Sequence, residues 1–465
     1  MIENVPAAPQ AVRGRYVRLR DNSSNMRKVV KFGGSSLADA RQFEKVGAIV
    51  RADPGRVFVV PSAPGKRFNK DVKVTDLLYQ CCALAQEGKD FTDPFTEIQS
   101  RYNEILRGLK LDYSLEQEFG IIAAHLRSGE VSRDYIASRG EYLNGLVLAQ
   151  YLGYPFLDPA DVIFFDENGQ LDEAKTDKVA GETLEKLDRA VIPGFYGRGA
   201  DGRVKTFTRG GSDITGSIIA AACHASTYEN WTDVSGFLVA DPRIVDDPAV
   251  IRTITYKELR ELAYMGAGVL HENAIFPVRK QGIPINIRNT NRPEDEGTWI
   301  VESTCQKSGY TITGVAGKKD FCAVLIYKEM MNSEIGYCRK VLQAFEENDI
   351  SIEHMPSGVD TMTVVVHETE FVHKEQKVVS AIRRLAHPDT IEITSDIALI
   401  AVVGRGMKMT RGTSGRIFSA LAHAHVNVVM IDQGSSEMNI IIGVQNADYE
   451  RAIRAIYDIF VTTQL

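Results

Sequence analysis

Several kinds of residue are scarce in this chain of 465 residues, and each scarcity argues against a class of protein. The six cysteines form no CxxC pair, so neither a disulfide framework nor a cysteine-based zinc site is expected. The nine histidines show no metal-ligand spacing, and we therefore assign no metal-ligating residue. So few cysteines are typical of a cytoplasmic protein with reduced thiols, and we expect that location.

Excess positive charge and long apolar runs are also lacking. With 54 lysines and arginines against 61 aspartates and glutamates, the net charge is −7, which argues against nucleic acid as a partner. No apolar run approaches the roughly 20 residues that a membrane span needs, so we expect no membrane partner either. Residues 1–25 lack the apolar core of a signal peptide, and we predict a flexible extension there.

Apolar runs that resemble strands alternate with helical stretches from Met26 to about Pro293. Examples are VVKF, which leads into a helix near Leu37, and RVFVVPSA, which precedes a helix near Thr75. This alternation predicts an α/β domain with a largely parallel sheet. We place the limits of this domain at residues 26–300.

The rest of the chain contains an internal repeat. After a shift of 76 residues, FCAVLIYKEM (321–330) falls on IALIAVVGRG (397–406). With the same shift, ISIEHMPSGVDTMTVVV (350–366) falls on VNVVMIDQGSSEMNIII (426–442). Each copy reads strand, helix, strand, strand, helix, which is most of a βαββαβ unit.

The second copy has almost no chain left for its last strand. The natural donor is TITGVA (311–316), which stands just before the first copy. We therefore predict that one domain, residues 317–394, is inserted into another, which consists of residues 301–316 and 395–465.

The stretch KFGGSS (31–36) joins a predicted strand to a helix. Its two glycines allow a tight bend or a close approach to a ligand, and the helix offers free N–H groups to a phosphate. Lys31, at the strand end, would lie beside such a phosphate. The alternative is a turn capped by Ser36 and Asp39 without any ligand, which a glycine pair alone would favour.

The stretch TFTRGGSD (206–213) repeats this arrangement, and two such turns in one domain favour binding over simple capping. Arg209 could hold a carboxylate through two hydrogen bonds. Asp213, in the first turn of the predicted helix, could orient a lysine or a magnesium ion. Its other interpretation is an acid that complements the helix dipole.

Other polar residues stand near predicted ends of strands and helices. Glu141, in SRGE, would pair with a substrate ammonium group or else cap a helix with Ser138. Ser62 lies at the C-terminal end of a strand, where ligands bind in open α/β sheets. Thr75 is most simply a helix N-cap.

The stretch NWTDVSGFLVADPR (230–243) reads as a strand followed by a loop. Thr232 and Asp233 are placed to hydrogen-bond an adenine or a ribose. Arg243 either meets phosphates or is a solvated surface charge.

Taken together, these motifs resemble those of the aspartate kinases, in the amino-acid-kinase superfamily. The resemblance rests on KFGGSS, PSAPGK, SRGE, FTRGGSD, WTDVSGFLVADPR and GAGVLHENAIFPVRKQGIPINIRNT, in the family's order. It covers nearly all of the chain after Met26, and the repeat resembles the paired ACT domains of monofunctional members. The implied fold is an αβα sandwich with a mostly parallel sheet, followed by two ferredoxin-like βαββαβ regulatory domains.

The implied reaction transfers the γ-phosphate of ATP, with Mg²⁺, to the side-chain carboxylate of L-aspartate, the first step toward lysine, threonine and methionine. Because that carboxylate is already ionised at neutral pH, the reaction needs positioning and charge neutralisation rather than a strong base. The resemblance also implies a homodimer formed through the ACT domains and feedback inhibition, by lysine or, as the second choice, by threonine.

The resemblance assigns roles by motif position, with Lys31 and Asp213 as the catalytic residues. The residues implied to hold the nucleotide are Lys31, Gly33, Gly34, Ser35, Thr232, Asp233 and Arg243. The residues implied to hold the aspartate are Ser62, Thr75, Glu141, Arg209, Gly210, Gly211 and Ser212. The residues implied to hold the effector are Met331, Ser333, Ser357, Gly358, Val359 and Asp360.

Two positions depart from the family pattern. Gly268 stands where the family often has a lysine near ATP, so magnesium or another cation (Arg243, Lys205 or Lys280) would have to supply that charge. Leu238 stands where many members have a tyrosine near the adenine.

Two alternatives to an aspartate kinase stay open. One is a related kinase that acts on glutamate, N-acetylglutamate, carbamate or UMP. Glu141 argues against an N-acetylated substrate, because no free ammonium group would meet it. The other is an amino-acid sensor that has lost catalysis, which the missing lysine at position 268 favours.

Overall fold

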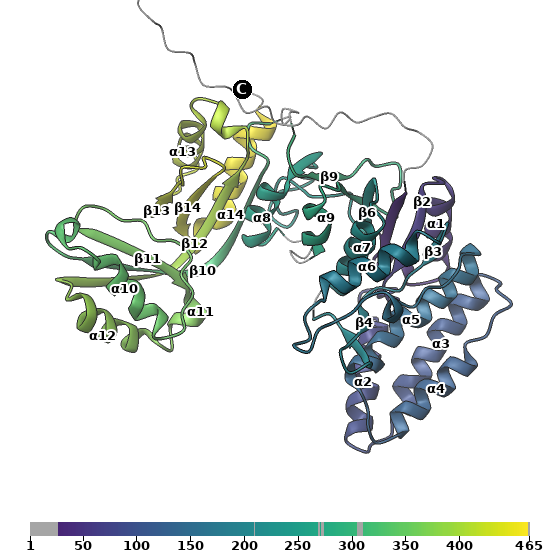
Figure 1. Ribbon diagram of the computed structural model, residues 1–465. Helices are drawn as coiled ribbons and strands as arrows, with labels where there is room; N and C mark the ends of the chain where they lie inside the picture. The colour runs from purple at the N-terminus through teal and green to yellow at the C-terminus, as the bar shows by residue number, and fades with distance from the viewer. Residues whose placement is uncertain (1–26, 209, 268–269, 271–273, 305–309, 464–465) are drawn as a thin grey trace, which may run out of the picture.

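The computed structural model describes residues 27–208, 210–267, 270, 274–304 and 310–463 (Figure 1). Helices and strands up to Val301 form one body, and a second sheet with its own helices begins at Gly314. The extension predicted at residues 1–25 lies outside the described residues.

The first body is built on a seven-stranded sheet in the order β3-β2-β1-β6-β8-β9-β7. Neighbouring strands from β3 to β8 pair in parallel, whereas β9 runs antiparallel to β8 and parallel to β7. The predicted, largely parallel sheet is therefore confirmed, with two reversed strands at one edge. The strands are β1 (Lys28–Phe32), β2 (Arg56–Pro61), β3 (Ala190–Val191), β6 (Thr227–Thr232), β7 (Thr253–Thr255), β8 (Ile285–Asn289) and β9 (Thr298–Val301).

Helices cover both faces of this sheet, because its central strands are apolar on both sides. In β1, Val29 belongs to the apolar cluster of α6 to α9, whereas its neighbour Val30 belongs to the cluster of α1 to α5. Successive strand residues point to opposite faces, so a run such as VVKF needs a cover on each side. The αβα sandwich is confirmed.

The bounds of these helices are as follows. The first face carries α6 (Glu173–Leu184), α7 (Gly211–Ala222), α8 (Tyr256–Tyr264) and α9 (Phe276–Lys280). The second face carries α1 (Ala40–Arg51), α2 (Val74–Gln86), α3 (Thr92–Gly108), α4 (Glu116–Arg127) and α5 (Arg133–Leu152). This body also includes the 3₁₀ turns η1 (Gly34–Leu37) and η2 (Pro159–Asp161).

The strand that precedes α7 lies outside the main sheet. It is β5 (Val204–Thr206), which pairs with β4 (Tyr196–Arg198) in a two-stranded antiparallel sheet. The second glycine-rich turn, at residues 210–213, therefore follows a hairpin, whereas the first follows the central strand β1.

The second body is a five-stranded antiparallel sheet in the order β11-β10-β12-β14-β13. Its strands are β10 (Gly314–Tyr327), β11 (Thr361–His367), β12 (Thr390–Val403), β13 (Met430–Asp432) and β14 (Asn439–Gln445). Its helices are α10 (Tyr337–Glu346), α11 (Glu368–Phe371), α12 (Glu375–Ala386), α13 (Thr413–His423) and α14 (Tyr449–Tyr457). Short turns are η4 (Met331–Ser333), η5 (Met407–Met409), η6 (Asn446–Asp448) and η7 (Asp458–Thr462).

The long strands β10 and β12 pass through both repeats. Residues 314–318 of β10 pair with residues 399–403 of β12, and residues 323–327 pair with residues 390–394. The strand needed by the second repeat thus comes from the segment before the first repeat, which is the pairing that an inserted domain requires. The domain limits themselves stay a prediction.

A seam separates the two parts of these strands. The register shifts there, and Asp320 of β10 and Asp396 of β12 adopt positive φ angles of 70° and 64°. Asn446 Nδ2 donates to the Oδ1 atoms of both aspartates, at 3.1 and 2.8 Å. One amide side chain therefore ties the two bulged strands together.

One predicted strand of the first repeat does not form. Instead of a strand at residues 350–356, isolated bridges join His354 to Val365 and Ser357 to Met362. Pro356 lies between these bridges and has no N–H to donate, which weakens pairing at the sheet edge.

Candidate active site

Lys31 and Asp213 lie at the centre of the candidate site. Lys31 is in β1 and Asp213 is in the first turn of α7, and their Nζ and Oδ1 atoms are 2.6 Å apart. Their side chains are only 9% and 17% exposed. Asn230, in the adjacent strand β6, donates to the same Oδ1 atom at 2.9 Å. The two predicted turns are thus joined through one buried ion pair, which fixes the lysine beside the first turn.

The glycines of the first turn let two backbone segments touch. A Cβ on Gly34 would lie 2.8 Å from the carbonyl oxygen of Ala63, and one on Gly65 would lie 2.6 Å from the carbonyl carbon of Gly34. The Gly65 amide donates to the Gly34 carbonyl at 2.8 Å. A side chain at either glycine would push the two loops apart, so this turn is one wall of a larger site.

The alternative in which Ser36 and Asp39 cap a helix together is wrong. Asp39 alone is the N-cap of α1, and its carboxylate accepts from the Gln42 amide at 2.9 Å. Ser36 lies in η1, and its hydroxyl shares a hydrogen bond with the Thr290 hydroxyl at 2.8 Å.

The second turn also depends on small residues. Gly210 precedes α7 with a φ of 60°, which glycine adopts without strain. A Cβ on Gly211 would lie 2.5 Å from the ring of Phe195, and one on Gly194 would lie 2.5 Å from Ser212 Cβ. Ser212 is therefore packed beneath this turn. Arg209 lies outside the described residues.

A cavity of about 760 Å³ opens beside the first turn, and we call it the acid cavity. Its walls come from η1, from the loop between β2 and α2, from α5 and from the loop after β6. The volume is within the usual range of small-molecule sites, about 300–1,000 Å³. The predicted site residues that line the acid cavity are Gly34, Ser35, Ser62, Thr75, Glu141 and Asp233.

Thr75 faces the acid cavity from the first turn of α2. The N-cap of α2 is Lys73, so the interpretation of Thr75 as the cap is wrong. Ser62 follows β2, and its amide donates to the Phe32 carbonyl at 3.0 Å. Asn144 of α5 donates to the Ser62 carbonyl at 2.6 Å, which fixes the backbone of Ser62 against that helix.

Glu141 has the most perturbed ionisation in the acid cavity. The residue is 5% exposed, and burial raises the pKa of its carboxyl to about 8. The hydrogen bond from the Ala63 amide and the charges of Arg139 and Lys31 oppose this rise in pKa without cancelling it. Within the described part of the chain, Glu141 Oε2 has no hydrogen-bond partner. An unpaired buried carboxylate is costly, so ionisation of Glu141 is favoured only when a cation lies beside Oε2.

The alternative role of Glu141 in a capping box with Ser138 is wrong. Both residues lie inside α5, whose N-cap is Ser132. The Ser138 hydroxyl donates to the Tyr135 carbonyl at 2.7 Å.

The loop between β2 and α2 is held by charged residues that the sequence analysis missed. Arg101 of α3 donates to Asp71 at 3.1 Å and to the Gly65 carbonyl at 2.6 Å. Arg67 donates to both oxygens of Asp71 at 2.9 and 3.0 Å and to Glu104 at 3.1 Å. Hydrogen bonds from Arg67 and the charge of Arg101 hold the pKa of Asp71 well below its usual range.

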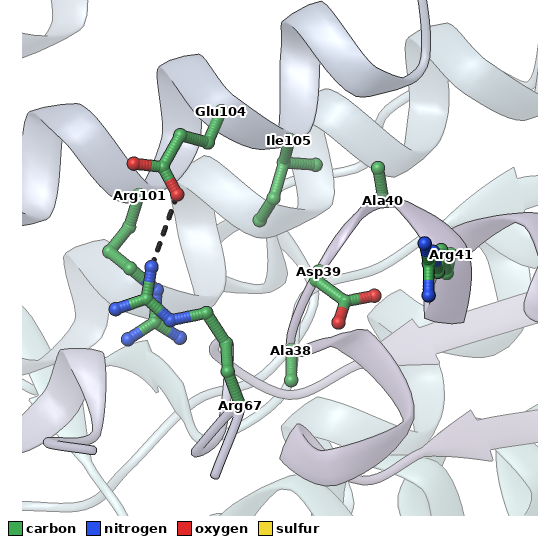
Figure 2. Close-up of a pocket in the computed structure, with 8 residues that line it drawn as sticks. All are labelled: Ala38, Asp39, Ala40, Arg41, Arg67, Arg101, Glu104 and Ile105. Carbon is green, nitrogen blue, oxygen red and sulfur yellow. Dashed lines mark hydrogen bonds and ion pairs between the residues drawn. The ribbon is translucent and has the colours of Figure 1, made fainter.

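Figure 2 shows Arg67 and Arg101 lying together beneath Glu104, on the wall of a neighbouring cavity of about 270 Å³. Because Gly65 and Arg67 also line the acid cavity, this cluster of charges positions its rim. The sequence shows Arg101 only as one charge among several on a helix, so no local signal could have identified it.

The predicted nucleotide residues of the loop after β6 do not lie together. Asp233 lines the acid cavity, whereas the Thr232 hydroxyl exchanges hydrogen bonds with the Val234 backbone. Arg243 pairs with Asp241 at 2.6 Å and has a side chain that is 86% exposed. Arg243 lines a second cavity, of about 790 Å³.

This second cavity, which we call the junction cavity, lies between the loop of residues 234–244 and the second body. Phe237 and Leu238 supply apolar surface to it. An apolar cavity with a few charged groups is typical of a site for a small molecule that has both an apolar and an ionic part.

The predicted effector residues lie at one end of the second sheet. Met331 and Ser333 belong to η4, just after β10, and residues 357–360 precede β11. The Lys328 amide donates to the Asp360 carbonyl at 2.9 Å, which brings the two turns side by side. Met331 is buried, whereas Val359 is 66% exposed.

No cluster of three or more histidine, cysteine, aspartate or glutamate side chains that could hold a metal occurs among the described residues. In the same part of the chain, no helix has the length and apolar character needed to cross a bilayer.

Comparison with known proteins matches the chain to two family models. The amino acid kinase family matches residues 26–289, and an ACT domain family matches residues 400–460. Over 451 residues the chain is 38% identical to aspartokinase 3 of Bacillus subtilis, an alignment that covers 93% of this chain and 98% of that protein.

Solved structures that resemble this chain are also aspartate kinases. The crystal structure of the Clostridium acetobutylicum aspartate kinase, described as an allosteric enzyme, is 51% identical, with a TM-score of 0.85 and coverage of 94% of this chain and 100% of that one. Escherichia coli aspartokinase III, in complex with aspartate and ADP, has a TM-score of 0.69 at 24% identity, with coverage of 93% and 99%. This second likeness shows the shared fold.

Proposed function

Since this chain belongs to the aspartokinase family of amino acid kinases, we propose that it is an ATP-dependent aspartate kinase. In this reaction the side-chain carboxylate of L-aspartate attacks the γ-phosphorus of ATP, the bond to the bridging oxygen breaks, and ADP leaves. The product is 4-phospho-L-aspartate, which begins the route to lysine, threonine and methionine.

The observation that carries the proposal is the unpartnered, buried carboxylate oxygen of Glu141 in the acid cavity. L-Aspartate carries one ammonium group, which would pair with Glu141. Ser62 and Thr75 line the same cavity and would donate hydrogen bonds to the substrate carboxylates. Arg209 would hold the α-carboxylate, beside Gly210, Gly211 and Ser212. N-acetylated acceptors have no ammonium group and would leave Glu141 unpaired.

Lys31 and Asp213 would be the groups nearest the transferred phosphoryl group. The Lys31 ammonium would neutralise charge on the phosphoryl oxygens, and the amides of Gly34 and Ser35 would donate to phosphate. Gly33 would approach the phosphate with its backbone only, because its own amide donates to the Trp231 carbonyl at 3.0 Å. Asp213 orients Lys31 through their ion pair.

Mg²⁺ in such reactions is held by the nucleotide phosphates with one or two carboxylates, and it neutralises charge that develops on them. The described residues offer no cage of three acidic or imidazole ligands, and the single carboxylate of Asp213 fits a metal that arrives with the nucleotide.

The nucleoside end of ATP and the phosphates next to it would occupy the junction cavity, which Arg243 lines. Thr232 and Asp233 do not line that cavity and would meet the nucleotide where it passes toward the acid cavity. Phe237 and Leu238 supply its apolar surface, and Leu238 offers packing where a tyrosine would stack.

Regulation is the second part of the proposal. An amino-acid effector, lysine before threonine, would bind where Met331 and Ser333 meet residues 357–360, and two chains would pair through their second sheets. The adjacency of those two turns supports a site there. A cytoplasmic location rests on the low cysteine content.

A hydroxamate assay tests the reaction. The protein is supplied with ATP, Mg²⁺, hydroxylamine and either aspartate or glutamate, and we expect hydroxamate from aspartate alone. Hydroxamate formed from glutamate and not from aspartate would show that glutamate is the substrate and that the proposed reaction is wrong. No hydroxamate from either acid, together with lysine binding in calorimetry, would favour a sensor without catalysis.

A further inference from the structure

The junction cavity is walled on one side by the second body. Val315 and Lys318 of β10 and Tyr449 of α14 face the loop that carries Phe237, Leu238 and Arg243. A ligand in this cavity would therefore touch both bodies of the molecule.

Strand β10 is hydrogen-bonded to the loop that carries Phe237, Leu238 and Arg243. The Val315 amide donates to the Val239 carbonyl at 2.7 Å. The neighbouring Gly314 packs so closely that a Cβ there would lie 2.9 Å from Leu262 Cδ1 of α8. These two contacts fix the start of β10 relative to the loop, and with it the position of Lys318.

The Lys318 side chain lines the cavity. A Cβ on Gly266 would lie 3.8 Å from Lys318 Cγ and 3.9 Å from Cε, so this side chain passes beside the turn that follows α8. Its Nζ atom lies 5.0 Å from the ring centre of Tyr264. Lys318 is the last residue paired before the register shift in β10, and a bulge of this kind re-aims the side chains beside it.

Lys318 differs from the other cations near the site in having no acidic partner. Across the described residues, no carboxylate lies within ion-pair distance of its Nζ atom. Lys319 pairs with Glu450 at 3.6 Å and Arg243 pairs with Asp241 at 2.6 Å. The other cations considered from the sequence are paired as well, Lys205 with Asp134 at 3.2 Å and Lys280 with Glu173 at 3.3 Å.

The described residues after α8 that line the cavity beside Lys318 are Met265, Gly266 and Ala267, and none of them carries a charge. A polyphosphate that reaches this end of the cavity therefore meets Lys318, a cation whose charge no acidic partner offsets among the described residues, next to Lys319, which is paired with Glu450.

We infer that Lys318 binds the phosphates of the nucleotide, so that a residue of the second sheet completes the nucleotide site of the first body. This inference rests on the proposed function, because it takes the nucleotide as the occupant of the junction cavity. Binding is then reciprocal: a shift of β10 changes nucleotide affinity, and a bound nucleotide stabilises the position of β10.

The test compares Lys318→Met, which keeps most of the aliphatic stem and removes the charge, with Lys377→Met on the exposed surface of α12. Dissociation constants for ADP are measured by calorimetry on the full chain. We expect ADP binding to weaken about tenfold or more in Lys318→Met, as for the loss of one hydrogen bond to a charged group. Lys377→Met should bind as the wild type does, and Lys318→Arg should recover most of the affinity.

Turnover adds a second readout. In Lys318→Met the KM for ATP should rise by a similar factor while the KM for aspartate changes less than about twofold. Wild-type ADP affinity in a folded Lys318→Met protein would overturn the inference and leave the proposed reaction intact. A wild-type protein that binds ADP but forms no aspartyl hydroxamate would remove the proposed reaction, and the ADP measurement on Lys318→Met would still decide the role of the lysine.

Discussion

The two bodies of this molecule treat charge in opposite ways. Up to Val301, the described residues include many buried acidic and basic side chains. They are Lys31, Arg56, Asp71, Arg101, Arg139, Glu141, Glu229 and Glu258. From Gly314 onward, no lysine, arginine, aspartate or glutamate among the described residues is buried, and the core is aliphatic and aromatic.

This contrast indicates different tasks. A buried charge costs free energy unless it is paired, so a protein retains it where a dry, fixed charge is needed. The first body uses such charges to hold loops and, in the proposed function, to bind a substrate. The second body has an apolar sheet with its candidate binding residues on surface turns, an arrangement suited to moving as a unit and to recognising a ligand at its edge.

Removing the central buried charge of the first body should have the largest effect. Lys31→Ala should lower kcat about a thousandfold or more, as for the loss of a preorganised group that stabilises the transition state. The hydroxamate assay measures this effect. Lys45→Ala, on the exposed surface of α1, is the matched control and should behave as the wild type.

Lysine binding to the second body of Lys31→Ala should stay unchanged in calorimetry, because the two bodies divide the tasks. Near-normal turnover in Lys31→Ala would show that the phosphate assignment is wrong.

Glu141 should have the next largest effect and a characteristic pH dependence. Its pKa of about 8 leaves the free site largely protonated at pH 7, whereas an ammonium ligand needs the carboxylate. The KM for aspartate should therefore fall as pH rises from 7 to 8, by up to about tenfold per unit, and level off above pH 8. Initial rates over that range measure it.

Glu141→Gln should raise the KM for aspartate by about 10- to 100-fold and remove this pH dependence.

The same substitution should increase the stability of the fold at high pH. Because the pKa is raised in the folded state, ionisation of Glu141 destabilises the fold, beginning near the unfolded value of 4.5 and reaching its full extent above pH 8. Glu141→Gln should therefore melt higher than the wild type at pH 8.5, with a difference that shrinks toward pH 5. An equal KM in both proteins at pH 8.5 would count against an ammonium partner.

A substitution in the second body is expected to have the smallest effect on catalysis. Asp360→Ala, in the turn beside η4, should leave kcat without effector within about twofold of the wild type. It should raise the lysine concentration needed for half-inhibition about tenfold, as for the loss of one charged contact. Reduced kcat without effector would show that the division of tasks between the two bodies is not as clean as their cores suggest.

Much of the fold could be predicted from the sequence, because its causes are local. Apolar runs such as VVKF predict strands that are covered by helices on both faces. The sequence repeat at residues 321–442 predicts two domains of similar structure. The absent strand near residue 354 and the hairpin position of β5 could not be predicted, since they depend on which edge of a sheet a segment meets.

The candidate site shows the same limit. Glu141 was recognisable within its motif, but its burial and its unpaired oxygen depend on α5 packing against the loop after β2. Arg101 and Lys318 reach their sites from distant segments, and neither stands in a motif. Their roles arise from tertiary contacts, to Gly65 for Arg101 and to Gly266 for Lys318.

The sharing of β10 and β12 has a consequence for how the second body comes apart. Each strand is 14 residues long and gives one half of its length to each repeat. If one repeat unfolds, half of β10 and half of β12 lose their pairing, and the other halves of the same strands belong to the other repeat. Heat or denaturant should therefore melt the two repeats in one cooperative transition. Exchange of a single repeat between relatives would likewise replace half of each of these two strands.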